Sequence, residues 1–418
     1  MRAADSHIMP SYRRSNLQFV RGDGAWLETP DGEKYLDFGS GIAVNTLGHS
    51  HPRLVAALKD QAERLWHVSN LYQIPEQEEL ADILCAHCFA DYVFFGNSGA
   101  EAAEGMIKAM RKYHAVQGQP QRTKLISFAG AFHGRTLAAL AAAGNAAYLE
   151  GFGPVPQGFA QADSFDIDAV ESLIDANTAG ILIEPVQGEG GVRDVGEAFL
   201  QALRALCDRH GLLLGFDEVQ CGIGRTGRLF AHEWAGVTPD VMAIAKGIGG
   251  GFPLGAVLAT KAVGEVMQPG THGSTFGGNP LACAVGTAVM QCVLEDGFLD
   301  QIVSTGNYFR QQLSHLVDSY SDIFTEIRGR GLMLGLQCAP PNTEIVEALR
   351  AQHLLTVGAG DNTIRLLPPL NVSRQDVKTA LAAIEAACQA VRLQNGEADA
   401  NADTNADTNA DTKEDTAP

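Results

Sequence analysis

The 418-residue chain is poor in basic residues, in aromatic residues and in long apolar runs. Lys and Arg number 30 against 49 Asp and Glu, which leaves a net charge of −19. Nucleic acids and anionic membrane surfaces both require a basic surface, so neither is expected as a partner. Gly, Pro or a charged residue interrupts every apolar run well before bilayer-spanning length, so no transmembrane segment is expected.

Targeting signals and disulfides are also not expected. The first residues, MRAADSHIMPSYRRS, have no apolar run behind their charges, which argues against a secretory signal; Met1 and Met9 remain alternative starts. Eight scattered cysteines are typical of buried thiols in a reducing compartment, which predicts a cytoplasmic protein. The pair Cys85 and Cys88 has no second pair at zinc spacing, so we expect core thiols and no metal site.

The chain ends in an acidic repeat. Residues 396–418 repeat NADT three times and hold no large apolar side chain. Such a segment cannot bury enough apolar surface to offset the entropy of ordering, so we predict a disordered tail.

Short apolar runs alternate with helical patterns from about residue 90 to residue 260. The runs are YVFFGNS, KLISFAG, AGILIEPV, GLLLGFDEV and VMAIAKGI. This alternation predicts an α/β fold with a mostly parallel sheet flanked by helices. We predict an N-terminal segment (1–50) that contributes to a smaller domain, a large domain (51–278), a small α+β domain (279–395) and the tail.

Charged and polar residues stand where the predicted strands end. In GLLLGFDEVQ, a run typical of a buried strand leads directly into Asp217 and Glu218. Burying an ionised carboxylate is costly without a positive partner. Because ligands of open α/β sheets bind outside the carboxyl ends of the strands, these positions are the candidate site.

The turn FFGNSGAEA offers an anion site. Ser98, Gly99 and Ala100 open a predicted helix, where free backbone N–H groups suit a phosphate. The alternative is a capping box between Ser98 and Glu101, which needs no ligand.

Further strand ends carry an aromatic ring, a guanidinium and another carboxylate. Phe132 could stack on a flat ligand and Arg135 could bind a carboxylate, although both could be ordinary loop residues. Glu184 ends another strand, and a lone glutamate there is more often solvated or capping than functional.

Lys246 closes a strand and enters a glycine-rich loop, AIAKGIGGGFPLG. Burial would lower its pKa and favour the nucleophilic amine, whereas the alternative is a lysine that reaches out to solvent. The nearby GIGRTG fits a dinucleotide motif by letter, but no good helix follows it, so we reject that interpretation.

Together these residues suit pyridoxal 5′-phosphate. A buried Asp217 would keep the ring nitrogen protonated, Lys246 would hold the aldehyde as a Schiff base, and the helix start would receive the phosphate. Phe132 would cover the ring face.

The chain resembles the class III (subgroup II) aminotransferases of the fold-type-I pyridoxal-phosphate superfamily. The resemblance runs in family order from about residue 12 to residue 392. It rests on these motifs: YLDFGSGIAVNTLGHSHP, FFGNSGAEA, GAFHGRT, ILIEPVQGEGG, FDEVQCGIGRTG, AKGIGGGFPLGA, HGSTFGGNPLA and IRLLPPL.

The resemblance implies a fold with a seven-stranded sheet, a role for each matching residue, and a homodimer with shared sites. As catalytic residues it implies Lys246 and Asp217. As cofactor-binding residues it implies Ser98, Gly99, Ala100, Phe132, Asp217, Glu218, Val219, Gln220, Lys246 and, from the neighbouring subunit, Thr275. As substrate-binding residues it implies Arg135, Glu184, Ser274 and Arg365, with Glu184 neutralising Arg365 in one half-reaction.

The implied reaction is a ping-pong transfer of an amino group from an amino acid to 2-oxoglutarate. The stretches GIAVNTLGHSHP and NLYQIPEQ favour acetylornithine as the donor. Succinylornithine, ornithine, 4-aminobutyrate and succinyldiaminopimelate remain alternatives, as does a protein that keeps the fold without turnover.

Overall fold

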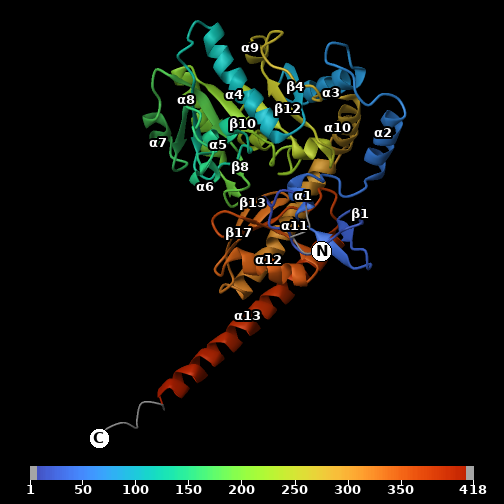
Figure 1. Cartoon of the computed structure of the whole chain (residues 1–418), viewed down its shortest axis with the longest axis vertical. Helices are drawn as coiled ribbons and strands as arrows, with labels where there is room; N and C mark the ends of the chain where they lie inside the picture. Colours follow the sequence, from blue (N-terminus) through green and yellow to red (C-terminus); the bar gives the residue numbers. More distant parts are fainter. Residues whose placement is uncertain (1–6, 411–418) are drawn as a thin grey trace.

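The computed structural model describes residues 7–410, with side chains through residue 394. Figure 1 shows a large α/β body, a smaller domain beneath it and one helix that projects away from both.

A seven-stranded sheet forms the centre of the large domain. Its order is β4 (Tyr92–Gly96), β12 (Gly255–Ala259), β11 (Val241–Ile244), β10 (Leu213–Asp217), β7 (Thr178–Ile183), β5 (Lys124–Phe128) and β6 (Phe159–Ala162). Only β12 runs antiparallel to its neighbours. The predicted mostly parallel sheet is therefore confirmed, and the carboxyl ends of its other six strands meet at one edge.

Helices cover both faces of this sheet. In the large domain they are α2 (Pro52–Ala62), α3 (Pro75–Ala86), α4 (Gly99–Val116), α5 (Leu137–Ala143), α6 (Ala146–Leu149), α7 (Ile167–Ser172), α8 (Glu197–His210), α9 (Lys261–Gly264) and α10 (Pro280–Val293), with short 3₁₀ turns η2 (Ala231–Ala235) and η3 (Lys246–Gly249).

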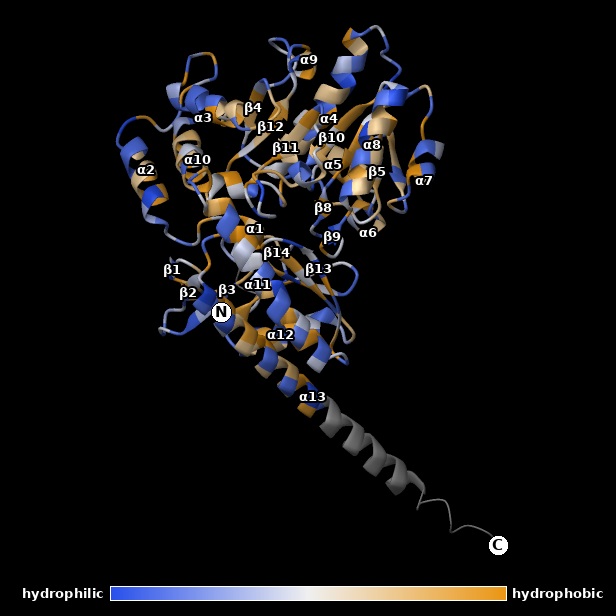
Figure 2. Ribbon diagram, turned by 180° about the vertical axis from the view of Figure 1, so that it is seen from behind, coloured by the Kyte–Doolittle hydropathy of each residue, from blue (hydrophilic) through white to orange (hydrophobic). Residues whose placement is uncertain are grey.

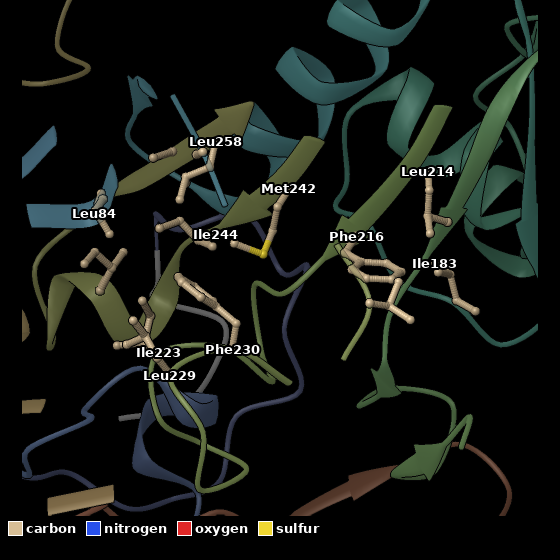
Figure 3. Packing of buried hydrophobic residues seen from close by; sticks show 14 of the residues in the cluster. Leu84, Ile183, Leu214, Phe216, Ile223, Leu229, Phe230, Met242, Ile244 and Leu258 are labelled. Atoms are coloured by element: carbon tan, nitrogen blue, oxygen red, sulfur yellow. The ribbon is translucent and has the colours of Figure 1, made fainter. Parts of the chain in front are cut away.

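The alternation of side chains along β10 explains the two layers. Leu213 packs with α4 on one face, whereas Leu214 and Phe216 join the core formed with α3, α8 and α10. Figure 3 shows Leu214 and Phe216 in that second layer near Ile183. Because successive residues of a strand point to opposite faces, Asp217 lies on the α4 side.

The small domain joins the N-terminal strands to the C-terminal third of the chain. One sheet has the order β1 (Arg21–Asp23), β2 (Trp26–Glu28), β3 (Lys34–Asp37) and β15 (Leu354–Leu355), and another has β13 (Phe324–Arg330), β14 (Met333–Cys338), β17 (Thr363–Leu366) and β16 (Val357–Ala359). The helices of the small domain are α1 (Ser40–Ala43), α11 (Phe298–Ser319), α12 (Asn342–Ala351) and α13 (Arg374–Ala410). A two-stranded hairpin, β8 (Val186–Gln187) with β9 (Arg193–Asp194), faces this domain.

Two boundaries differ from the prediction. Helix α10 is apolar on all sides and packs with α2 and α3 in the core of the large domain, so its residues do not begin the small domain at position 279. Helix α13 continues to Ala410, into the segment predicted as a disordered tail, and no proline interrupts it. The rest of that segment lies outside the described residues.

Within residues 7–410 no single helix is long and apolar enough to cross a bilayer. By length and composition, only the bent pair of α10 and α11, taken together, could do so.

Candidate active site

Asp217 is buried at the end of β10 and has two hydrogen-bond partners. Its Oδ2 lies 2.8 Å from Nδ1 of His133, and its Oδ1 accepts from the backbone N–H of Val219 at 3.0 Å. Both side chains of the pair are almost completely inaccessible to solvent. The structure thus places the ring of His133 against Asp217, and the sequence assigned no role to this histidine. The only signal was its place in the strand-end motif FAGAFHGRT.

Lys246 follows β11 and opens η3 with a left-handed backbone, φ +48°. A non-glycine residue in this region is uncommon and stores strain, which often marks a functional site. Burial lowers the pKa of Lys246, while the charges of Glu189 and Asp217 act in the opposite direction. A lowered pKa increases the share of neutral amine, the form that attacks a carbonyl.

The start of α4 combines a helix cap with a close approach to Val219. The Ser98 hydroxyl accepts from the backbone N–H of Glu101 at 3.2 Å, so the capping alternative is confirmed for this bond. A Cβ on Gly99 would lie 2.7 Å from Cγ1 of Val219. The N–H groups of Gly99 and Ala100 stand in the first turn, where a helix leaves donors free.

Phe132 lines a cleft of about 630 Å³, and the Arg135 guanidinium lies near its ring. The Arg135 guanidinium lies 3.8 Å above the ring of Tyr148 in α6 and 5.6 Å from the centroid of Phe132. Phe132, Tyr148 and Glu189 all line this cleft. The guanidinium is exposed and forms no ion pair among the described residues, so it is available to a carboxylate.

The prediction that Glu184 neutralises Arg365 is wrong. Nη1 of Arg365 donates to Oε1 of Glu189 at 2.6 Å. Oε2 of Glu184 instead accepts from the backbone N–H of Phe132 at 3.1 Å. Burial, then the negative charge of Asp217, raises the pKa of Glu184 well above its usual range. Such a carboxyl favours its neutral form and is a poor partner for a guanidinium.

Glu218, predicted to bind the cofactor, is turned into the core. Its carboxylate accepts from the backbone N–H groups of Ala231 and His232 at 2.6 and 2.8 Å, and lies 2.8 Å from Nδ1 of His232. It is fully buried. Its neighbour Asp217 points to the opposite face, because successive strand residues alternate. Glu218 therefore holds η2 in place.

The remaining predicted residues fall into two places. Gln220 lies beside the Arg365 pair, with its Oε1 3.4 Å from Nη1. Ser274 accepts from the Asn97 side chain at 3.3 Å, next to the start of α4, and Thr275 is exposed. In the part of the chain that the structure describes, no hydrogen bond joins Thr275 to the site, so its role from a second subunit stays a prediction.

The donor set fits pyridoxal 5′-phosphate. The buried Asp217 matches its ring nitrogen, and Lys246, whose pKa is lowered, matches its aldehyde. The start of α4, packed too tightly at Gly99 for any side chain, matches its phosphate. Phe132 and Val219 could flank a flat ring.

The family model for class-III aminotransferases matches residues 8–388. The chain belongs to this family.

Similar proteins agree with that assignment. Acetylornithine aminotransferase of Mesorhizobium japonicum is 59% identical over 386 residues, covering 92% of this chain and 97% of the relative. Among solved structures, N-acetylornithine aminotransferase from Stenotrophomonas maltophilia superposes with a TM-score of 0.81 at 36% identity, covering 91% and 98% of the two chains. Ornithine aminotransferase from Toxoplasma gondii, described with pyridoxal phosphate at its active site, gives 0.88 at 33% identity, covering 93% of each.

Proposed function

We propose that this class-III aminotransferase moves the terminal amino group of N2-acetyl-L-ornithine to 2-oxoglutarate. The products are N-acetylglutamate 5-semialdehyde and glutamate, a step of arginine biosynthesis. The observation that carries the proposal is the 59% identity to an acetylornithine aminotransferase over nearly the whole of both chains.

The proposal assigns the cofactor to the residues at the strand ends. Pyridoxal 5′-phosphate, when bound, supplies a protonated pyridine ring that withdraws electrons from the substrate carbon. Asp217, oriented by His133, would keep the proton on the ring nitrogen, and the N–H groups of Gly99 and Ala100 would receive the phosphate. Ser98, Phe132, Val219 and Gln220 would complete the binding site.

Lys246 has two roles in this proposal. Its Nζ would hold the cofactor aldehyde before the substrate arrives. Once released, Nζ would take the proton from the substrate carbon that bears the amino group, acting as general base. The lowered pKa of Lys246 supports this role, because only the neutral amine can accept a proton.

Glu189 and Arg365 would let one site accept two kinds of substrate. Acetylornithine reacts at an amine far from its carboxylate, whereas glutamate reacts at an amine beside one. While acetylornithine is bound, Glu189 would cover Arg365 and Arg135 would hold the distant carboxylate. When 2-oxoglutarate enters, Glu189 would release Arg365 for the near carboxylate. Their 2.6 Å pair, almost closed to solvent at Arg365, supports this exchange.

A panel of amines tests the substrate. We expect the wild type to convert acetylornithine faster than succinylornithine, ornithine, 4-aminobutyrate and succinyldiaminopimelate in single turnovers. Lys246→Ala should lose turnover with all of them, and labelled cofactor trapped by borohydride in the wild type should be recovered on Lys246. A faster reaction with ornithine or 4-aminobutyrate, or label on another lysine, would contradict the proposal.

We also infer a cytoplasmic homodimer. All eight cysteines are free, which supports a reducing compartment. Large apolar side chains are exposed in two segments: Leu65, Trp66, Leu71 and Tyr72 in one, and Phe276 in the other. Tyr72 is 67% exposed and Trp66 is 63% exposed. Exposed apolar residues of this size support an interface. In the dimer, Thr275 and Ser274 of one copy would approach the phosphate held by the other.

A further inference from the structure

Two hairpin turns meet behind the Glu189–Arg365 pair. Glu189 lies in the turn between β8 and β9, and Arg365 lies on β17, just after the turn that joins it to β16. The N–H of Gly360, in that second turn, donates to the backbone carbonyl of Glu189 at 2.8 Å. The backbone of Glu189 is therefore held by the hairpin that carries its partner.

The two turns touch without any side chain between them. A Cβ on Gly191 would lie 2.8 Å from the carbonyl oxygen of Gly360, and a Cβ on Gly360 would lie 2.9 Å from that of Glu189. Both separations are shorter than real Cβ contacts. The two glycines therefore let the turns approach more closely than any side chain would allow.

Asp361 adds a side-chain link between the two turns. Its Oδ2 accepts from Nη1 of Arg328 at 2.6 Å and from Nη2 of Arg193 at 3.3 Å. Arg193 begins β9, directly after the Glu189 turn, and Arg328 also reaches the carbonyl of Gly191 in that turn at 3.5 Å. The hydrogen bond from Arg328 lowers the pKa of Asp361, so its carboxylate stays charged.

The position of Asp361 is itself constrained. Asp361 and Asn362 have left-handed backbones, φ +50° and +49°. The Asn362 side chain donates to the carbonyls of Cys338 and Pro340 at 2.6 and 2.8 Å, which fixes the turn on the small domain. Strain of this kind persists only where the surroundings determine the conformation.

We propose that Asp361 is a positioning residue for the exchange at Arg365. By fastening the Glu189 turn to the Arg365 hairpin, it lets the Glu189 side chain swing away while its backbone stays in register for return. The proposal rests on the proposed function, because it assumes that Glu189 and a substrate carboxylate compete for Arg365.

The simpler interpretation is an ordinary surface ion pair. The side chains of Asp361 and Arg193 are 36% and 41% exposed, and such pairs contribute about 0–1 kcal/mol to stability. A purely stabilising pair would change the melting temperature alone. A positioning residue would change how well a dicarboxylate competes for Arg365.

Binding of glutarate to the holoenzyme separates these interpretations. Glutarate has the two carboxylates of 2-oxoglutarate but cannot react, so calorimetry reports only its dissociation constant. Asp361→Ala should weaken the Glu189–Arg365 pair and tighten glutarate binding by about threefold, the size that a partly exposed ion pair allows. The KM for acetylornithine should rise while kcat changes little. Asp361→Asn, which can still accept from Arg328, should keep part of the wild-type behaviour.

A double-mutant cycle locates the effect. Glu189→Gln should also tighten glutarate binding, and adding Asp361→Ala to it should change nothing further, because the residue being positioned no longer pairs with Arg365. The matched control is Glu197→Gln, which removes another exposed ion pair of the small-domain strand β13, 2.9 Å from Arg330, and should leave glutarate binding unchanged. Melting temperatures of all variants confirm folding.

Three outcomes would overturn the inference: unchanged glutarate binding in Asp361→Ala, an equal shift when Glu189 is already replaced, or the same shift in Glu197→Gln. A wild type that fails to convert acetylornithine would instead overturn the proposed function, and the glutarate cycle could still be measured.

Discussion

At the scale of single residues, burial decides what each carboxyl group of the site can do. One oxygen of Asp217 lies against the His133 ring and the other accepts from the backbone N–H of Val219, so both carboxylate oxygens have a hydrogen-bond partner. Glu184 has one backbone donor, and its pKa is raised by burial and by Asp217. Glu189 is partly exposed, which suits the exchange of partners proposed for it.

Glu184→Gln should stabilise the protein at neutral and alkaline pH. Because the folded pKa of Glu184 lies above its ordinary value of 4.5, the folded state binds more protons than the unfolded state between those two values. Stability of the wild type therefore falls as the pH rises from about 4.5 through the raised pKa. Glutamine keeps an oxygen for the N–H of Phe132 and carries no charge.

The measurement is the free energy of unfolding of both proteins from pH 4.5 to pH 9, restricted to the range in which unfolding is reversible. The advantage of Glu184→Gln should grow with pH and disappear near the acid end. A difference that is independent of pH would show that Glu184 has the same pKa in both states.

At the scale of elements, the start of α4 depends on how closely it approaches the turn after β10. Gly99 lies against Val219 and beside Ala245, which precedes Lys246. Within β10, a Cβ on Gly215 would lie 3.1 Å from Sδ of Met110, so α4 fills the space that this glycine leaves. The helix that would receive the phosphate is thus seated on the strands that carry Asp217 and Lys246.

Gly99→Ala should weaken binding of pyridoxal 5′-phosphate by about tenfold, because forcing extra volume into a packed site costs about 1–3 kcal/mol. Its Cβ would lie 2.7 Å from Val219, whereas no atom lies within 4 Å of a Cβ at Gly153, the control site. Cofactor affinity can be measured by fluorescence titration of the cofactor-free protein.

Two variants sharpen this test. Gly153→Ala should bind the cofactor as the wild type does, and Val219→Ala added to Gly99→Ala should restore part of the affinity by making room. If Gly99→Ala binds normally, the close packing at α4 has no part in the cofactor site.

At the scale of the whole molecule, the exposed apolar residues around Trp66 and Tyr72 are the surface on which the proposed homodimer can be tested. We expect Trp66→Glu together with Tyr72→Asp to convert a dimer into monomers, because charges at the centre of an apolar interface lose their water. Light scattering coupled to gel filtration gives the mass. Leu393→Asp is the control: Leu393 is 69% exposed on the projecting α13, away from these segments.

Monomers in the wild type, or dimers in both variants, would contradict this interface. Loss of transaminase activity together with dimerisation would support sites shared between subunits. In the ribbon of Figure 2, apolar residues follow the central strands, whereas polar and apolar residues alternate along the helices around them.

The sequence by itself determined the mostly parallel sheet, which the structure confirms. It also predicted a site at the strand ends with Asp217 and Lys246 as its catalytic residues, and those roles stay a prediction. These follow from local patterns: a buried strand ending in a carboxylate, and a lysine entering a glycine-rich loop. The tertiary structure alone decided the partners. Glu189 lies five residues after Glu184 in the same motif, and only the approach of two hairpin turns from different domains brings it to Arg365. Likewise, the Glu218 carboxylate accepts from the backbone of η2, and His133 reaches Asp217 across the sheet edge. Such pairings depend on distances between segments far apart in the chain, which no local pattern records.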